Sequence, residues 1–356
     1  MEINGKEINK SSATYFIADI AANHDGDIER AKDLIYLAAK AGADAAKFQH
    51  FQAKTIVSDF GFNALGSEKS HQSKWKKSVY DVYSAASVNL EWTETLVQTC
   101  AEAKIAFFTT PYSLEVVDFL DPYVPAYKIG SGDINWPEMI KKVAEKNKPY
   151  FIATGASSLI EVKNAINLAL SVNNNLCLMQ CNTNYTASLE NFKYINLNVL
   201  KVYAELFPDL CLGLSDHTPG HSTVLGAVTL GARAIEKHFT DSNDREGPDH
   251  KFSMDPASWK EMVERTRELE FSLGSSEKRV EPNEAETVIV QRRSMRALRN
   301  VSEGDKVSPG DFYPLRPCPS DAMELKDLGS MEGMRISRSI NKGDYLKEGD
   351  LYIDND

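Results

Sequence analysis

Short apolar runs alternate with amphipathic stretches along most of the chain, from Thr14 to about Ser272. Each run is rich in β-forming residues and ends in polar residues or glycine, and a stretch with helical spacing follows. Within 27–41, Leu34, Leu37, Ala38 and Ala41 have the i, i+3, i+4, i+7 spacing of one buried helix face. The predicted strands are Thr14–Ile20, Asp44–Gln49, Ala106–Thr110, Ala126–Gly130, Tyr150–Thr154, Leu176–Gln180, Cys211–Ser215 and Ala234–Lys237. The predicted helices include 27–41, 90–103, 137–145, 159–170, 220–231 and 256–271.

This alternation predicts the fold class. Strands that alternate with helices indicate a parallel sheet, and eight such units predict an α/β protein with a closed (β/α)8 TIM barrel. The active site of such a barrel lies at the C-terminal ends of its strands. An open, doubly wound sheet is the alternative, and it is disfavoured because no glycine-rich fingerprint follows the first strand.

The pattern changes after about Glu281. Two stretches, Glu303–Tyr313 and Lys342–Tyr352, repeat Gly-Asp at the same spacing, which is typical of tight turns. We therefore expect a barrel over 1–280, a linker over 281–295 and a small β-rich domain with internal pseudo-symmetry over 296–356.

The connection after the second predicted strand, 58–89, is unusually long. Long loops above a barrel often act as lids, and a solvated insertion is the alternative. This connection carries the basic and aromatic residues Lys69, His71, Lys74, Lys76, Lys77, Tyr80 and Tyr83.

Composition and charge exclude several classes of function. The 356 residues carry a net charge of −11, which argues against non-specific nucleic-acid binding. The basic run 291–299 is short and is better explained as a solvated or interdomain face. No apolar run approaches the ~18 residues that would span a bilayer, and the first residues lack the apolar segment of a signal peptide. Five cysteines without a CxxC pair fit a reducing compartment, so we expect a cytoplasmic protein without membrane contact.

Two histidines each follow a short apolar run that is predicted to be a strand, and the helix-like stretch 220–231 lies between them. His217 lies just past the run Cys211–Leu214, and His238 lies just past Ala232–Ile235. Because parallel strands finish at the same edge of a sheet, the two imidazoles are expected to meet over one site. Neutral imidazole is a common ligand for divalent metals. Two unrelated structural histidines are the alternative.

Other polar residues lie at the same strand ends. Lys47 and Lys128 occupy equivalent positions in two units, and together with nearby hydroxyls they predict a cradle for phosphate or carboxylate. Asp19 and Asp133 are candidates for acid–base roles, or for simple strand-end caps. A metal held by only two protein ligands would keep open positions for activating a carbonyl.

At this point the residues resemble the sialic acid synthase family, over nearly the whole chain. The tail resembles the antifreeze-like (β-clip) domain that this family carries. The matching motifs are Asn23-His24-Asp25-Gly26, Ala46-Lys47-Phe48-Gln49, Phe108–Ser113, Tyr127–Gly132, Ala153-Thr154-Gly155, Gly213–Thr218 and Glu236–Asp241, with Arg245, Gly247, Pro248 and Asp249.

The resemblance implies an enzyme that condenses phosphoenolpyruvate with the open-chain aldehyde of an acylated amino sugar. The products are a nine-carbon α-keto acid and phosphate. His217 and His238 would hold a divalent metal, most often Mn²⁺, with Mg²⁺ and Co²⁺ as alternatives. The phosphoenolpyruvate site would comprise Lys47, Thr110, Lys128, Ser131, Thr183 and Ser215. The sugar would contact Asn23, Tyr185 and Asp249, and also Arg316 from a partner subunit, which implies a domain-swapped homodimer.

This chain departs from the family pattern at several positions. Asp19 and Asp133 stand where glutamate is usual, and Ala153 replaces a frequent serine. The segment 181–186 lacks the usual Tyr-Pro ending, and Pro-Cys-Pro-Ser follows Arg316 in place of the usual Pro-Gly. These differences favour a non-standard acceptor over N-acetylmannosamine itself, and the resemblance leaves both N-acetylmannosamine-like sugars and 2,4-diacetamido-trideoxyhexoses open.

Two further functions are alternatives. A Kdo-8-phosphate synthase-like enzyme would use a phosphorylated aldose and would need a second anion cradle, which the sequence does not display outside the basic residues of 58–89. A non-catalytic sugar-binding homologue would have no need of His217 and His238.

Overall fold

The computed structural model describes residues 1–356 apart from 66–71, 73–74, 76, 328, 330 and 354–356. The chain divides into two compact units, Met1–Gly274 and Ser275–Asp356, and each is described by itself. Among the described residues, no helix combines the length and the apolar character needed to cross a bilayer.

The first unit is a closed barrel of eight parallel strands, which confirms the predicted fold class. The strands follow one another around the barrel in chain order, and β10 closes it by pairing with β3. Every predicted strand is present, with its ends within two residues of those predicted. The strands are β3 (Tyr15–Asp19), β4 (Ala45–His50), β5 (Ala106–Pro111), β6 (Tyr127–Ile129), β7 (Tyr150–Ala153), β8 (Leu176–Cys181), β9 (Cys211–Asp216) and β10 (Ala232–His238).

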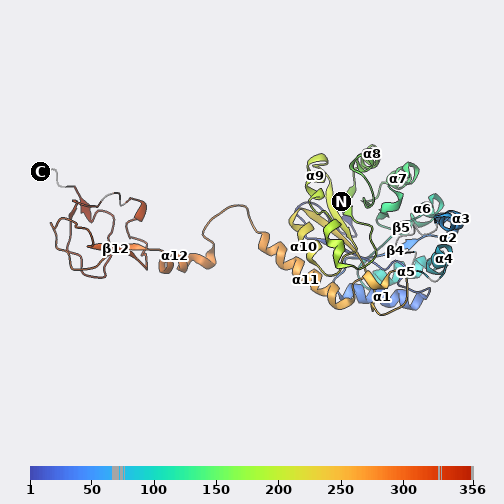
Figure 1. The fold of residues 1–356 in the computed structure, drawn as a ribbon, viewed down its shortest axis with the longest axis horizontal. Coiled ribbons are helices and arrows are strands. Elements are labelled where there is room, and N and C mark those ends of the chain that lie inside the picture. The colour runs from blue at the N-terminus through green and yellow to red at the C-terminus, as the bar shows by residue number, and fades with distance from the viewer. Residues whose placement is uncertain (66–71, 73–74, 76, 328, 330, 354–356) are drawn as a thin grey trace. The chain divides into compact units, whose positions relative to one another are not determined.

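Helices surround the strands and bury their apolar faces against them (Figure 1). The first, α1, begins after Asp27, whose carboxylate accepts the backbone N–H groups of Glu29 and Arg30. Its buried face includes Leu34, Ile35 and Ala38, and the half-buried Leu37 packs against the same core, so the predicted face is confirmed. The helices are α1 (Ile28–Lys40), α5 (Thr93–Glu102), α6 (Leu114–Leu120), α7 (Pro137–Glu145), α8 (Leu159–Leu170), α9 (Val199–Leu206), α10 (Ser222–Thr229) and α11 (Pro256–Leu273).

In its described residues, the long connection between β4 and α5 contains three short α-helices. They are α2 (Ala53–Ile56), α3 (Asp59–Ala64) and α4 (Val79–Ala86). The basic residues Lys69, His71, Lys74 and Lys76 lie outside the described residues, so a lid role for this connection stays a prediction.

The second unit consists of short strands and turns around a small apolar core. Helix α12 (Ala285–Gln291) lies within 281–295, the range expected to be a linker. The strands form two antiparallel pairs, β11 (Ser294–Ala297) with β12 (Phe312–Leu315), and β13 (Arg335–Ile336) with β14 (Leu351–Tyr352).

The predicted pseudo-symmetry of this unit recurs in its ion pairs. Arg299 makes a two-pronged contact with Asp311, at 2.7 and 2.9 Å. Arg338 makes the same contact with Asp350, at 2.8 Å for both bonds. In both cases the arginine precedes the aspartate by 12 residues. The two halves thus share an interaction as well as a sequence pattern.

Candidate active site

The register of three neighbouring strands aligns three functional side chains. His238 on β10 lies opposite Asp19 on β3, and Asp19 lies opposite Lys47 on β4. Because β10 and β3 are the last and first strands of the barrel, closure brings together residues from opposite ends of the unit. The three side chains therefore form one row at the C-terminal edge of the barrel.

Lys47 and Asp19 form a buried ion pair. Lys47 Nζ lies 2.7 Å from Asp19 Oδ2, and the same oxygen accepts a hydrogen bond from Gln49 at 2.9 Å. Burial opposes ionisation of Asp19, but the charge of Lys47 and the hydrogen bonds from Lys47 and Gln49 outweigh it and hold the pKa of Asp19 below its ordinary value. Lys47 also donates to Thr110 Oγ1 at 3.3 Å. Asp19 is thus an ionised carboxylate, and it is held by its neighbours.

A second pair lies nearby, between Lys128 on β6 and Glu236 on β10. Lys128 Nζ lies 2.6 Å from Glu236 Oε1, which also accepts a hydrogen bond from Ser215 at 3.1 Å. The other oxygen of Glu236 is buried and has no hydrogen-bond partner in the described part of the chain. Glu236 was not among the predicted site residues. Its spacing of two from His238 on a strand would have identified it, because such residues share a face.

The two predicted histidines meet as expected. The ring centroids of His217 and His238 are 5.3 Å apart, and Phe252 packs against both, at 5.9 and 4.9 Å. Tyr185 lies 4.4 Å from His217, centroid to centroid. Burial lowers the pKa of both imidazoles, that of His238 to about 3, so both rings are neutral at physiological pH.

The donor atoms of these imidazoles fit a divalent metal. His217 Nδ1 lies 2.9 Å from the carbonyl oxygen of Asn182, an arrangement that leaves the lone pair on Nε2 free for a ligand. His238 Nδ1 is buried and has no hydrogen-bond partner among the described residues. No group of three or more His, Cys, Asp or Glu side chains with metal-binding geometry occurs in that part of the chain. The protein could therefore contribute two imidazoles and leave the remaining positions to water or substrate.

A buried network supports the loop that carries His217. Lys237 pairs with Asp216, and each side chain is 1% exposed. Asp216 Oδ2 also accepts hydrogen bonds from Thr218 at 2.7 Å and from Thr223 at 2.8 Å. Lys237 donates to the backbone oxygen of Thr218 at 2.6 Å. The network fixes residues 216–218 against β10 and so fixes the position of His217.

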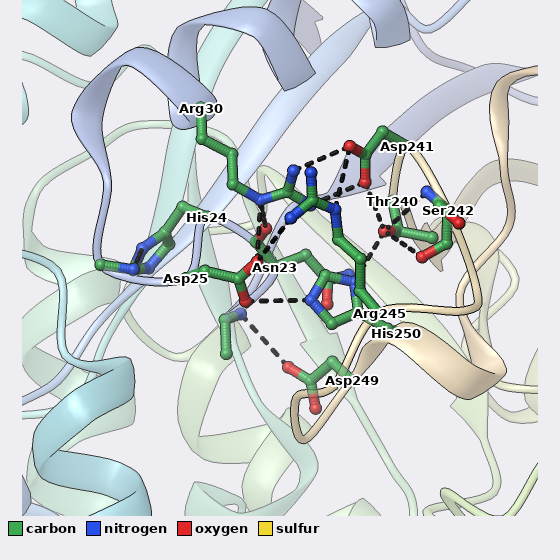
Figure 2. Close-up of polar contacts among 12 residues, drawn as sticks. Asn23, His24, Asp25, Arg30, Thr240, Asp241, Ser242, Arg245, Asp249 and His250 are labelled. Carbon is green, nitrogen blue, oxygen red and sulfur yellow. Dashed lines mark hydrogen bonds and ion pairs between the residues drawn. The ribbon is translucent and has the colours of Figure 1, made fainter.

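A second polar cluster ties the loop after β3 to the loop after β10 (Figure 2). Arg30 makes two hydrogen bonds to Asp241, both at 2.7 Å, and its Nε lies 2.9 Å from Asp25. The buried ring of His250 links Asp25, at 3.0 Å, to Thr240, at 2.7 Å. These contacts hold together two loops that contribute residues to the cavity at the barrel mouth.

The first of these loops contains Asn23, and the second contains Asp249. Asn23 donates from Nδ2 to Phe239 O at 2.8 Å and to Ser253 Oγ at 2.9 Å, so its amide serves the fold. Asp249 accepts the backbone N–H of Ala22 at 3.2 Å. Burial, reinforced by the charge of Asp19, raises the pKa of Asp249 to about 7.

These elements enclose a cavity of about 410 Å³ at the barrel mouth. Eleven of the predicted site residues line it, namely Asp19, Lys47, Thr110, Lys128, Ser131, Asp133, Tyr185, Ser215, His217, His238 and Asp249. Asn23 and Thr183 do not line it, and Arg316 belongs to the second unit. Sequence reasoning missed the lining residues Gln49, Tyr112 and Glu236.

Asp133 follows β6 in a short 3-10 turn, Ser131–Asp133. Burial raises its pKa to about 6, and one of its carboxylate oxygens is buried and unbonded within the described chain. Ser131 Oγ accepts the N–H of Gly155 at 2.9 Å. A Cβ on Gly155 would lie 2.5 Å from Thr183 Cγ2, so this close approach requires glycine.

The chain is similar to known synthases over nearly its whole length. The sequence profile of the NeuB family matches residues 34–278. The chain is 34% identical to the N,N'-diacetyllegionaminic acid synthase of Legionella pneumophila, over 97% of each chain. It is 30% identical to the human N-acetylneuraminate-9-phosphate synthase, over 97% of this chain and 94% of the relative.

Solved structures agree on the fold. The Bacillus subtilis spore coat polysaccharide biosynthesis protein spsE is 29% identical, with a TM-score of 0.65, over 100% of this chain and 99% of that one. An N-acetylneuraminic acid synthetase from Leptospira borgpetersenii aligns with a TM-score of 0.70 at 23% identity, over 81% of this chain and 94% of that one. The chain therefore belongs to the NeuB family of sialic acid, legionaminic acid and pseudaminic acid synthases, and is an enzyme of that carbon–carbon bond-forming, transferase-type class.

Proposed function

We propose that the enzyme condenses phosphoenolpyruvate with the open-chain aldehyde of an acylated amino sugar, with a divalent metal bound. The methylene carbon of phosphoenolpyruvate forms a bond to the aldehyde carbon. Water adds to the carbon that bears the phosphate, and phosphate leaves with cleavage of that C–O bond. The products are a nine-carbon α-keto acid and inorganic phosphate.

One observation carries this proposal: a single cavity holds two buried lysines and two neutral histidines. Lys47 and Lys128 are the cations that an anionic substrate requires, and Ser131, Ser215 and Thr110 lie in the same cavity as hydroxyl partners. His217 and His238 would hold the metal, which would polarise the acceptor carbonyl. Tyr185 packs against both imidazoles and would limit where the sugar can sit.

The charge balance of the cavity supports binding of a cation together with the substrate. Each lysine already has a carboxylate partner, Asp19 for Lys47 and Glu236 for Lys128. These four groups sum to no net charge, so phosphoenolpyruvate alone would add several uncompensated negative charges to a buried site. A divalent cation at the two histidines would offset them.

The aspartates would divide the proton chemistry. The lowered pKa of Asp19 keeps that group ionised, so it would orient Lys47 and not donate a proton. Asp133, with its pKa near 6, can take up and release a proton near neutrality, as the addition of water requires.

The acceptor is proposed to be an unphosphorylated acylated amino sugar of the N-acetylmannosamine or 2,4-diacetamido-trideoxyhexose type. Relatives named as legionaminic and pseudaminic acid synthases support this class. Because one relative is named an N-acetylneuraminate-9-phosphate synthase, phosphorylated sugars are also included in the test.

We also propose that the active form is a homodimer in which Arg316 of one subunit reaches the sugar bound by the other. Mixing two inactive variants, His217→Ala and Arg316→Ala, tests this directly. Exchange of subunits would regenerate activity only if the two residues act in one site from different chains. Continued inactivity after demonstrated subunit exchange would contradict it.

The reaction is tested by phosphate release from phosphoenolpyruvate, with Mn²⁺ or with EDTA, across phosphorylated and unphosphorylated amino sugars. We expect release that requires the metal and one unphosphorylated sugar. His217→Ala and His238→Ala should each lower the rate by at least about 100-fold and abolish Mn²⁺ binding measured by calorimetry. His221→Ala is the matched control, because that half-buried histidine lies at the N-terminus of α10, makes no side-chain capping bond there and does not line the cavity. Release with a phosphorylated aldose alone, or at full rate in EDTA, would contradict the proposal.

A further inference from the structure

Tyr112 brings a phenol side chain to the cavity at the barrel mouth. It directly follows β5 and is half-buried, and its ring packs edge-on against that of Phe51, with the centroids 5.8 Å apart. Among the described residues, none hydrogen-bonds to the hydroxyl of Tyr112. A tyrosine hydroxyl that is withdrawn from bulk water usually has a hydrogen-bond partner. Here that partner must come from the contents of the cavity.

The hydroxyl of Tyr112 lies beside the turn that carries Asp133. A Cβ on Gly130, which also lines the cavity, would lie 3.4 Å from Tyr112 Oη. The backbone oxygen of Gly130 accepts the N–H of Asp133 at 3.1 Å and so leads into the 3-10 turn. Burial raises the pKa of Tyr112 well above its ordinary value, and among the nearby charges that of Asp133 adds most. The phenol is therefore neutral at physiological pH and lies close to the Asp133 carboxyl group.

The carboxyl group of Asp133 lacks a protein partner in the same way. No side chain or backbone group in the described part of the chain hydrogen-bonds to it, and one of its oxygens is buried. Asp19, by contrast, is held by Lys47 and Gln49. A water molecule needs several polar partners to be ordered in a cavity, and two neighbouring acceptors without donors provide them. Tyr112 and Asp133 together thus form a subsite for one water.

We infer that Tyr112 is a further catalytic residue, which together with Asp133 holds the water molecule that attacks the carbon bearing the phosphate. The water donates one O–H to the Asp133 carboxylate and the other to Tyr112 Oη, which leaves a lone pair of its oxygen directed at that carbon. As the new C–O bond forms, the first proton passes to Asp133, and the phenol keeps its own proton. The inference rests on the proposed function and adds a residue to its water-addition step.

The test measures phosphate release by the full chain with Mn²⁺, phosphoenolpyruvate and the sugar that supports turnover. Tyr112→Phe keeps the ring and its packing against Phe51 and removes only the hydroxyl. We expect kcat to fall by about 10- to 100-fold, whereas the affinity for phosphoenolpyruvate measured by calorimetry should stay within about 3-fold. The solvent deuterium isotope effect on kcat should rise, because transfer of the water proton then limits the rate.

Further variants test whether both residues act on one water. Asp133→Asn removes the proton acceptor and should lower kcat by about 100-fold or more. Adding Tyr112→Phe to Asp133→Asn should cost less than about 3-fold more, because groups that act as a unit are not additive. Tyr123→Phe is the matched control, because Tyr123 is half-buried and lies outside the cavity. It should keep the wild-type kcat and isotope effect.

The outcomes separate this inference from the proposed function. A Tyr112→Phe enzyme with wild-type kcat would overturn the inference and leave the condensation intact. So would a lower kcat with an unchanged isotope effect, a loss explained entirely by weaker binding of phosphoenolpyruvate, or losses that multiply in the double variant. Absence of sugar-dependent phosphate release by the wild-type chain with every acceptor would overturn the proposed function, and the inference would fall with it.

Discussion

Lys47 and Asp19 face each other across the first two barrel strands, 2.7 Å apart and each only 2% exposed. Removing one partner of such a pair leaves an uncompensated buried charge. We expect Lys47→Met to destabilise the barrel by about 3–5 kcal/mol, and to abolish binding of phosphoenolpyruvate. Thermal unfolding of the barrel and calorimetric titration with phosphoenolpyruvate measure the two effects.

A control for this prediction is Lys142→Met, because Lys142 pairs with Asp118 at 2.6 Å on the exposed surface. Its cost should be below about 1 kcal/mol. The double variant Lys47→Met/Asp19→Asn should recover part of the lost stability, because no unpaired charge remains. A Lys47→Met protein as stable as the wild type would show that Lys47 and Asp19 do not form this buried ion pair.

The buried pair of Lys237 and Asp216 is expected to position His217 without contacting substrate, since neither residue lines the cavity. Lys237→Met leaves the Asp216 carboxylate with only the two threonine hydroxyls, and we expect a loss of about 3 kcal/mol. Because the network fixes residues 216–218, affinity for Mn²⁺ should fall by about 10-fold or more, as when partners behind a metal ligand are lost. Phosphoenolpyruvate affinity measured without metal should stay within a few-fold. Lost stability with unchanged Mn²⁺ affinity would contradict the positioning role.

Asp133 predicts a pH dependence of stability. Burial raises its pKa from 3.8 to about 6, so the folded state binds the proton more tightly than the unfolded state does. The stabilising contribution is fully present below pH 3.8 and is lost as pH rises through about 6. Asp133→Asn removes this dependence, so the variant should gain about 2–4 °C in the Tm of the barrel at pH 7.5. The gain should shrink by roughly half at pH 5.0. A gain independent of pH would contradict the assignment.

The paired halves of the second unit predict matched effects. Asp311 and Asp350 are both buried, and each accepts two arginine bonds and one backbone N–H, from Ser308 and Lys347 respectively. Asp311→Ala and Asp350→Ala should each cost about 1–3 kcal/mol in the unfolding of this unit. The exposed Glu348→Ala should have almost no effect. Strongly unequal costs for the two aspartates would show that the repeat in sequence is not a repeat in energetics.

The sequence predicted the barrel because that information is local. Each strand is a short apolar run bounded by polar residues, each helix has its own apolar spacing, and some helices have a capping side chain, as Asp27 illustrates for α1. The strand ends followed from the same runs, so His217, His238, Lys47 and Lys128 could be placed at one edge without coordinates.

The contacts that these residues make could not be predicted from local patterns. Glu236 lies 108 residues from Lys128, and Phe51 lies in a connection whose path over the barrel no local pattern specifies. Asn23 carried a sugar-binding prediction on its motif, yet its amide donates to Phe239 and Ser253. Such pairings depend on strand register and loop packing, which many sequences with the same alternation could satisfy differently.

The sequence by itself thus determined the alternating elements, the closed barrel they form and the polar residues at its C-terminal edge, because hydrophobic periodicity and strand direction are properties of each segment. Only the tertiary structure decided that Asp19 neutralises Lys47, that Glu236 neutralises Lys128, and that the two imidazoles meet 5.3 Å apart. The physical reason is closure. When β10 pairs with β3, residues more than two hundred positions apart become neighbours, and the register of that pairing sets their distances.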